Sequence, residues 1–205
     1  DALTLLAMTL RAMVWFHAQR VGRAGGELTT IGGARSAQGK DEAVSATDES
    51  LGLVLGPQAG PSFWQPVPAN GYAMVKLSPE SWSGSFSMGV QVVAPHSFIR
   101  SHTHDRHDEA IFVWQGHGRA LVGGSEHLIE PGSTIGLPRD VEHGFINDGG
   151  EDLTLVWVMA PHGLAEFFAA IGRPRRPGEP APAPFPRPAD VAAIEAATVF
   201  KVKPR

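Results

Sequence analysis

One short stretch of the chain concentrates the side chains that can bind a metal. Three histidines and three carboxylates lie within RSHTHDRHDE, residues 100–109. Imidazole nitrogens and carboxylate oxygens together bind divalent transition metals. The chain contains no cysteine, which excludes thiolate sites, disulfides and cysteine nucleophiles. A metal in this protein must therefore be held by nitrogen and oxygen.

The spacing of these residues suits the interior of a β-barrel. His102 and His104 are separated by one residue, and residues i and i+2 of a strand face the same side. Glu109 directly precedes the apolar run AIFVW (110–114), which predicts a strand that returns the carboxylate to the histidines. His143, in the second strand-like segment LPRDVEHGFIN, is the candidate for a fourth ligand.

Other interpretations of the cluster remain open. His104 and His107, three residues apart, would share one face of a helix, although AIFVW favours a strand. The polar residues 105–108 predict a turn at the barrel mouth, where His107 is either solvated or serves as an acid–base or lid residue. A barrel that keeps the four candidate ligands without holding a metal is the further alternative.

Alternation along the strands also predicts the side chains that surround the metal. The residues expected to share a face with a candidate ligand are Phe98, Arg100, Ile111, Val113 and Phe145. Met88, Gln91 and Trp157 lie on strands that could line the pocket too. Arg100 would either hold a carboxylate or enolate of a substrate or pair with an acidic residue at the rim. Glu109 keeps a carboxylate oxygen that can accept a substrate proton. Glu109 and Arg100 are therefore the candidate catalytic residues.

Short β-type runs separated by turn residues fill the middle of the chain. They are residues 51–55, 72–77, 85–93, 110–114, 119–123, 126–130 and 153–159. Runs at intervals of about ten residues, with Gly, Pro, Asn or Asp between them, predict an all-β sandwich or barrel. No βαβ alternation interrupts the pattern.

The composition divides the chain into three parts. Residues 1–50 comprise the apolar stretch ALTLLAMTLRAMVWF, which predicts an amphipathic helix, and a linker rich in Gly, Ala and Ser. Residues 51–160 form the predicted barrel. Residues 161–205 comprise the helix GLAEFFAAIG, a proline-rich strap over 173–188 and a short helix with Asp190 as its expected N-cap.

Bulk composition bounds the class of protein. The 205 residues are 42% hydrophobic and 19% charged with a net charge of −4, which is typical of a soluble globular protein. Nothing in this balance suggests a broad surface for nucleic acid or membrane. The apolar N-terminal stretch is too short to span a bilayer, and a degenerate targeting segment is the alternative to a packing helix. We expect a cytoplasmic location.

The first strand-like segment resembles motif one of the cupin superfamily. That motif reads Gly, five residues, His-x-His, three or four residues, Glu, six residues, Gly. The chain matches it with His102, His104, Glu109 and Gly116, and has His96 where the motif opens on glycine.

The segment around His143 resembles the second cupin motif, which reads Gly, five residues, Pro-x-Gly, two residues, His, three residues, Asn. The chain matches it with Gly132, Pro138, His143 and Asn147, and has Asp140 in place of the later glycine. Aspartate adopts left-handed backbone conformations more readily than most residues. Both departures fall at turns and leave the implied ligands in place.

The resemblance implies a single-domain cupin: an all-β jelly-roll barrel (double-stranded β-helix) with an N-terminal helix and a helical, proline-rich C-terminal extension. It implies one divalent metal per chain, with Fe(II) as the first candidate and Mn, Ni, Co, Cu or Zn as the others. The implied ligands are His102, His104, Glu109 and His143. Cupins commonly dimerise through barrel edges, so we expect a homodimer.

The order of segments after the predicted barrel resembles that of one group within the cupin superfamily. Small single-domain cupins similar to quercetin dioxygenases continue from the barrel into Pro-His-Gly-Leu and a helix, and PHGLAEFFAAIG (161–172) fits that order. The likeness implies a dioxygenase acting with dioxygen on a small, metal-chelating, aromatic or otherwise planar substrate. The alternatives are a non-oxidative metal-dependent isomerase, lyase or decarboxylase, and a binding module without catalysis. The single tyrosine, Tyr72, has no predicted place at the metal, which disfavours a lyase with a tyrosine base.

Overall fold

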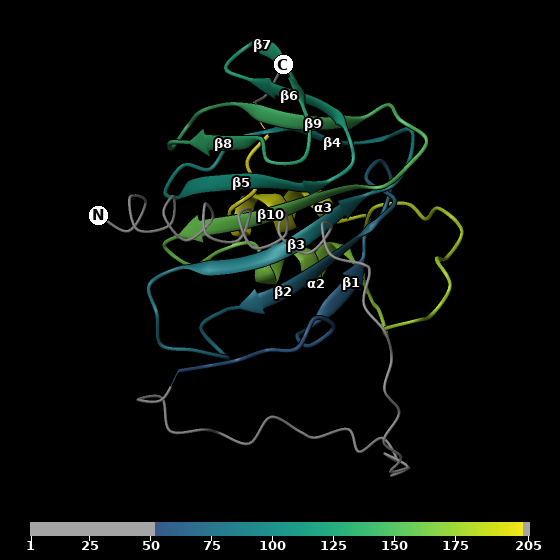
Figure 1. Ribbon diagram of the computed structural model, residues 1–205. Helices are drawn as coiled ribbons and strands as arrows, with labels where there is room; N and C mark the ends of the chain where they lie inside the picture. Colours follow the sequence, from purple (N-terminus) through teal and green to yellow (C-terminus); the bar gives the residue numbers. More distant parts are fainter. Residues whose placement is uncertain (1–51, 203–205) are drawn as a thin grey trace, which may run out of the picture. The chain divides into compact units, whose positions relative to one another are not determined.

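The computed structural model describes residues 52–202, whose regular secondary structure is mainly β-strand (Figure 1). The expected N-terminal helix and the linker at 21–50 lie outside the described residues. The described strands form two antiparallel sheets in a jelly-roll arrangement, as the sequence pattern predicts.

Seven strands form the larger sheet. In spatial order they are β11 (Arg173–Pro174), β1 (Ser62–Trp64), β2 (Tyr72–Leu77), β3 (Ser87–Val93), β10 (Leu153–Ala160), β5 (Asp108–Gln115) and β8 (Thr134–Leu137). The central strand β10 pairs with β3 on one side and with β5 on the other. This pairing sets Glu109, near the start of β5, opposite Met159.

Four strands form the smaller sheet. In spatial order they are β4 (Ser97–His102), β9 (His143–Asn147), β6 (Gly118–Val122) and β7 (Ser125–Ile129). The pairing of β4 with β9 sets His102 directly opposite His143. Two histidines far apart in sequence thus become neighbours across one ladder.

One hydrophobic core joins the two sheets. Trp157 and Val113 of the larger sheet belong to the same buried cluster as Phe145 and Ala120 of the smaller one. The alternation in LTLVWVM explains how β10 contributes, because Leu153, Leu155, Trp157 and Met159 all point inward and are at most 1% exposed. Burial of each large apolar side chain contributes ~1.5–3 kcal/mol to folding.

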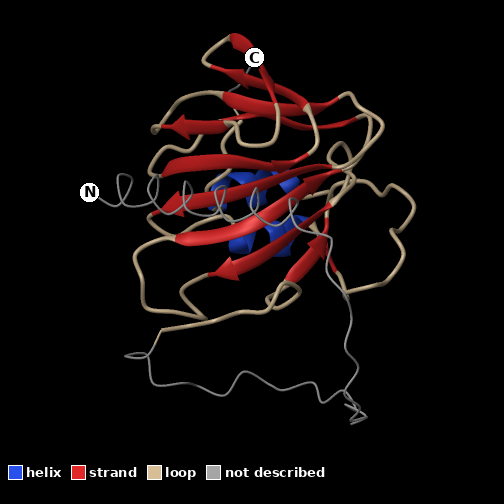
Figure 2. Ribbon diagram, viewed as in Figure 1, coloured by secondary structure: helices blue, strands red, loops and turns tan. Residues whose placement is uncertain are grey.

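Two short helices lie behind the larger sheet in the view of Figure 2. The helix α2 (Ala165–Ile171) buries Phe167, Phe168 and Ile171 in the core, and α3 (Val191–Ala197) follows the proline-rich strap. Both confirm helices expected from the sequence. Asp190 is the N-cap residue of α3, as expected, although its side chain makes no capping hydrogen bond. No helix within residues 52–202 has the length and apolar character needed to cross a bilayer.

The strand predictions failed at the short and isolated runs. Residues 52–55 form no strand, and Val54 is 96% exposed because this run has no neighbouring strand to pack on. The strands β1, β8 and β11 were not predicted. They have three, four and two residues, which is too short for an alternating pattern to stand out.

The two departures from the cupin motif glycines occupy left-handed turns. His96 has φ 56° and Asp140 has φ 62°. These are backbone conformations that glycine adopts without steric cost. The turn geometry is thus kept although the residue type has changed.

Candidate metal centre

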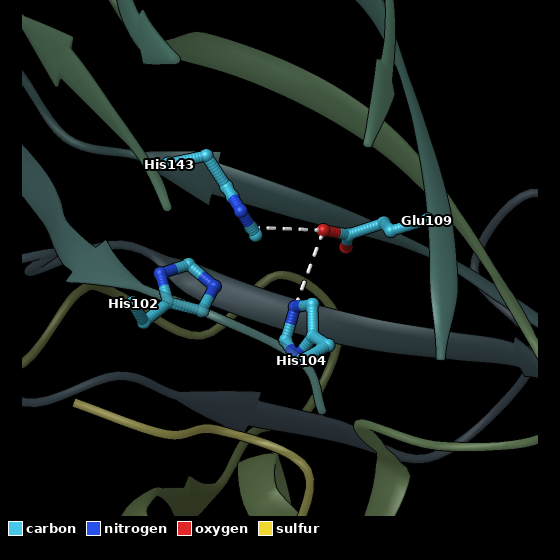
Figure 3. A group of neighbouring side chains, drawn as sticks. All are labelled: His102, His104, Glu109 and His143. Atoms are coloured by element: carbon cyan, nitrogen blue, oxygen red, sulfur yellow. Dashed lines mark ion pairs between the residues drawn. The ribbon is translucent and has the colours of Figure 1, made fainter. Parts of the chain in front are cut away.

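His102, His104, Glu109 and His143 converge in a buried group (Figure 3). Their potential ligand atoms all lie within 4.8 Å of one another. His102 comes from the end of β4, Glu109 from β5 and His143 from the start of β9. Each of the four side chains is at most 5% exposed. The structure therefore brings together all four residues that the sequence nominated.

Backbone carbonyls fix how the three imidazoles face the centre. Nδ1 of His102 lies 2.8 Å from the Arg100 carbonyl oxygen, and Nδ1 of His143 lies 2.9 Å from that of Val141. Nδ1 of His104 lies 2.7 Å from a carbonyl oxygen in the C-terminal segment, that of Val199. A carbonyl can only accept, so each Nδ1 must carry the proton. Each Nε2 is then a free lone pair, the form in which histidine binds a metal.

This tautomer leaves lone pairs facing one another. Oε2 of Glu109 lies 3.3 Å from Nε2 of His104 and 3.2 Å from Nε2 of His143. Both Nε2 atoms are buried and lack a hydrogen-bond partner among the described residues. Unpartnered buried acceptors are unfavourable, and a cation placed between them removes the penalty. The donor set thus fits a divalent transition metal.

The pKa values of His102, His104 and Glu109 are shifted by burial and by one another. Burial lowers the pKa of His102 well below its usual range, and the other two histidines lower it further. Burial also opposes protonation of His104, but the Glu109 carboxylate outweighs it and raises the pKa of His104. Burial would raise the pKa of Glu109, yet His104 and His143 lower it to about 2. The centre therefore favours an ionised carboxylate with a cation beside it.

A small, mostly apolar cavity opens on the centre. Its wall includes His102 and Glu109, and its volume is ≈ 30 Å³, room for about two water molecules. Of the pocket residues expected from the sequence, Gln91, Ile111, Phe145 and Trp157 line it.

The other four expected pocket residues lie elsewhere. Phe98 is 45% exposed, and Val113 is fully buried in the core beyond the cavity wall. Met88 is half-buried and does not line the cavity, because it and Gln91 are three residues apart on β3 and so face opposite sides. Arg100 lines an adjacent groove and pairs with Glu195.

A bulge in β4 explains the misplaced Phe98 and Arg100. The pairing of β4 with β9 shifts register between Ile99 and His102. An irregularity of this kind reverses the faces on which alternating side chains emerge. Ile99 therefore joins His102 on the cavity wall, which the strict alternation from His102 did not predict.

Aromatic side chains from outside the barrel strands complete the wall and were missed by sequence reasoning. They are Phe167, Phe168 and Phe200. The helical spacing of Leu164, Phe167, Phe168 and Ile171 in GLAEFFAAIG was the available signal for the first two. Phe200 had none, because it reaches the centre only through the return of the C-terminal segment. His107 is half-buried and does not belong to the four-residue group.

Residues 89–159, from β3 into β10, match the Cupin_2 family, described as the cupin domain. This part of the chain is a cupin domain. Protein SchB of Streptomyces halstedii is 32% identical over 74 residues, which are 36% of this chain and 54% of that protein. The cupin chain thus spans about half the length of this curated relative.

Solved cupin-like structures resemble this cupin domain at low sequence identity. The polyketide cyclase RemF from Streptomyces resistomycificus has a TM-score of 0.43 and 20% identity over 47% of this chain and 68% of its own. KdgF from Halomonas sp. has a TM-score of 0.42 and 19% identity, and the match covers 48% of this chain and 84% of KdgF. An RmlC-like cupin from Shewanella frigidimarina has a TM-score of 0.44 and 15% identity over 54% and 90%.

Proposed function

We propose that this cupin is a metal-dependent oxygenase acting on a small, metal-chelating substrate with a planar, apolar body. The observation that carries the proposal is the buried group of three imidazoles and one carboxylate beside a mostly apolar cavity, whose wall includes His102 and Glu109. His102, His104, Glu109 and His143 would hold the metal, with Fe(II) as the first candidate. Bound there, the metal would act as Lewis acid and electron conduit for substrate and dioxygen.

Glu109 would also handle a proton. Its Oε2 is the oxygen that faces His104 and His143. The second oxygen, Oε1, takes no part in those contacts and is available to accept the proton of an enol or phenol hydroxyl. His104 and His143 lower the pKa of Glu109 to about 2, which keeps the carboxylate ionised, the form that binds a metal.

The cavity wall supports an apolar substrate with at least one polar atom. Trp157 is 1% exposed and lines the cavity, and its Nε1 has no hydrogen-bond partner among the described residues. A substrate oxygen would satisfy that donor, and Gln91 offers a second polar contact on the same wall. The surrounding isoleucine, leucine and phenylalanine side chains would exclude water from the reacting atoms.

The only tyrosine disfavours a non-oxidative lyase that uses a phenolic base. Tyr72 packs edge-on against Trp64, with ring centroids 5.8 Å apart, and the Arg175 guanidinium lies 3.8 Å above its ring. It does not line the cavity. Glu109 remains the candidate base at the centre.

Oxygen uptake tests the proposal. Protein loaded separately with Fe(II), Mn(II), Ni(II), Co(II), Cu(II) or Zn(II) would be offered a panel of flavonols and 1,3-diketones in an oxygen electrode. We expect at least one metal form to consume substrate and oxygen in equal amounts. His104→Ala should abolish the uptake, and His117→Ala, at an exposed histidine, should retain it.

Two results would overturn the oxygenase proposal. Substrate conversion without oxygen uptake would favour an isomerase, lyase or decarboxylase. Stoichiometric binding of panel compounds without conversion by any metal form would favour a binding module.

We also propose a homodimer, formed through a barrel edge. The strand β7 is an edge of the smaller sheet, and its Leu128 is 87% exposed. An edge strand with an exposed apolar side chain is suited to pair with another copy. Light scattering of the wild type and of Leu128→Lys tests this proposal, since a monomeric wild type would contradict it. The cytoplasmic location stays a prediction from the sequence.

A further inference from the structure

Two arginines beside the metal centre converge on one carboxylate oxygen. Arg100 lies on β4 and Arg187 in the proline-rich strap, and the NH2 group of each donates to Oε1 of Glu195 on α3. The three side chains are largely buried, with exposed fractions of 26% for Arg100, 23% for Arg187 and 13% for Glu195. This cluster joins β4 to the strap and α3, which follow it by more than 80 residues.

The cluster carries more positive than negative charge. Two guanidiniums share the single carboxylate of Glu195, and no other acidic partner of either arginine occurs within residues 52–202. Burial lowers the pKa of Arg187, and the neighbouring Arg100 lowers it further. Arg119 on β6 shows the opposite balance, since it contacts two carboxylates, Glu126 and Asp148, at 2.9 Å each. The surplus charge at the pair is suited to an anion, and guanidinium groups match a carboxylate in shape.

The arginine pair lines a groove that adjoins the metal cavity. Arg100 and Arg187 both line this groove. Four residues line the groove and the metal cavity alike: Gln91, Ile99, Phe167 and Phe200. One extended ligand could therefore reach from the arginines to the metal centre once the ring between the two spaces moved aside.

That ring belongs to Phe200, and it lies where a planar ligand would lie. It stacks on His102 with centroids 3.9 Å apart and planes 10° apart. The ring also stacks on Phe167, with centroids 4.5 Å apart and planes 5° apart, and the Arg100 guanidinium lies 5.4 Å from its centroid. The slot between a metal-ligand imidazole and a phenylalanine is thus shaped for a flat aromatic group.

We propose that Arg100 and Arg187 form a subsite for a carboxylate of the substrate, and that Glu195 and Phe200 occupy the carboxylate and ring positions in its absence. The substrate class is then a planar aromatic carboxylate whose chelating group reaches the metal. This substrate assignment rests on the proposed function, but the subsite itself needs no metal. The C-terminal segment acts as an internal competitor that the substrate displaces.

Calorimetric binding of benzoate and benzamide to the full-length, metal-free protein tests the subsite. The two probes share a ring and differ in charge, so the ratio of their affinities isolates the arginine–carboxylate contact. We expect Glu195→Gln to raise the benzoate-to-benzamide ratio about tenfold, because an internal competitor is lost. We expect Arg187→Gln to lower the ratio about tenfold. Arg119→Gln and Glu126→Gln are matched controls on an exposed arginine–glutamate pair and should leave the ratio unchanged.

Opposite shifts in the two variants cannot arise from loss of folding, which would weaken both probes alike. A ratio that stays constant in Glu195→Gln and Arg187→Gln would overturn the subsite, as would failure of benzoate to bind Glu195→Gln at all. Inorganic phosphate that matches benzoate in affinity would also overturn the aromatic assignment. Failure of metal loading or of oxygen uptake would refute the proposed function and leave these metal-free shifts intact.

Discussion

Nε2 of His143 lies 3.2 Å from Oε2 of Glu109, and both atoms are acceptors. The imidazole cannot donate at Nε2 while its Nδ1 proton bonds the Val141 carbonyl. Two buried acceptors at this distance repel unless a proton or a metal ion lies between them. The metal-free centre therefore holds buried acceptors without a donor. A bound metal, or a proton on one of these side chains, should stabilise the protein.

Metal binding should stabilise the fold. At about 100 times its dissociation constant, a metal that binds only the folded state adds about 2.7 kcal/mol to the free energy of unfolding. Thermal unfolding with and without Co(II) or Mn(II) measures the shift, and elemental analysis measures metal per chain. His143→Ala and His104→Ala should lose both the shift and the metal. His117→Ala, at an exposed histidine, should keep both; an equal loss in this control, or retained metal in the ligand variants, would contradict the assignment.

Replacing Glu109 should change how metal-free stability depends on pH. The pKa of His104 is raised above 6.5, so its pairing with Glu109 stabilises the fold below about pH 6.5, and this is lost as pH rises through the raised value. The pKa of Glu109 is lowered from 4.5 to about 2, so its contribution is present above about pH 4.5 and is lost as pH falls toward 2. The pair thus stabilises the fold most between about pH 4.5 and 6.5.

The variant Glu109→Gln separates the two pH regimes. Its amide can donate to a neutral imidazole, so at pH 8 the metal-free variant should exceed the wild type by about 1 kcal/mol in the free energy of unfolding. At pH 5.5 the order should reverse, because the ion pair is gone. Urea unfolding at both pH values measures this crossing. Glu130→Gln, at an exposed glutamate, should have the stability of the wild type at both pH values. If Glu109→Gln were less stable than the wild type at pH 8, the facing lone pairs would be refuted.

Removal of the Phe200 ring should weaken the fold and open the slot beside the centre. Phe200 is 5% exposed and stacks between two rings, so Phe200→Ala should cost about 3–5 kcal/mol in the free energy of unfolding. Val202→Ala, on the same segment at 41% exposure, should change it by less than about 0.5 kcal/mol. The vacated slot should also bind toluene, as engineered apolar cavities bind small aromatics. A Phe200→Ala protein of wild-type stability would show that the ring does not fill the site in solution.

Asn147 should stabilise the fold without affecting metal binding. Its Nδ2 donates to the carbonyls of Val93, Ala94 and Glu151, and it is 1% exposed. Asn147→Asp replaces that donor with an acceptor facing carbonyl oxygens, so we expect a loss of about 3 kcal/mol in urea unfolding with metal per folded chain unchanged. Gln115→Glu makes the same chemical change at an exposed strand end and should be nearly neutral. Loss of metal from folded Asn147→Asp would contradict a purely structural role.

Local spacing was enough to find the four residues of the centre. His102 and Glu109 lie on strands, whose side chains alternate between two faces, and His104 lies two residues beyond the end of β4. His143 lies in a second motif of fixed spacing. The same regularity placed Ile111 and Phe145 on the cavity wall. It predicted the long strands well, because their apolar runs have several residues with which to show a period.

The tertiary structure decided what surrounds the centre. The bulge in β4 turned Ile99 inward and moved Phe98 and Arg100 away, and a register shift depends on the partner strand that sequence periodicity does not contain. The Val199 carbonyl fixes the tautomer of His104 from 95 residues away. The same return of the C-terminal segment stacks Phe200 on His102 and pairs Glu195 with Arg100. The sequence by itself determined which atoms can bind a metal, because that is local chemistry. Only the fold decided which segments enclose them, because contacts between distant segments arise from packing of the whole chain.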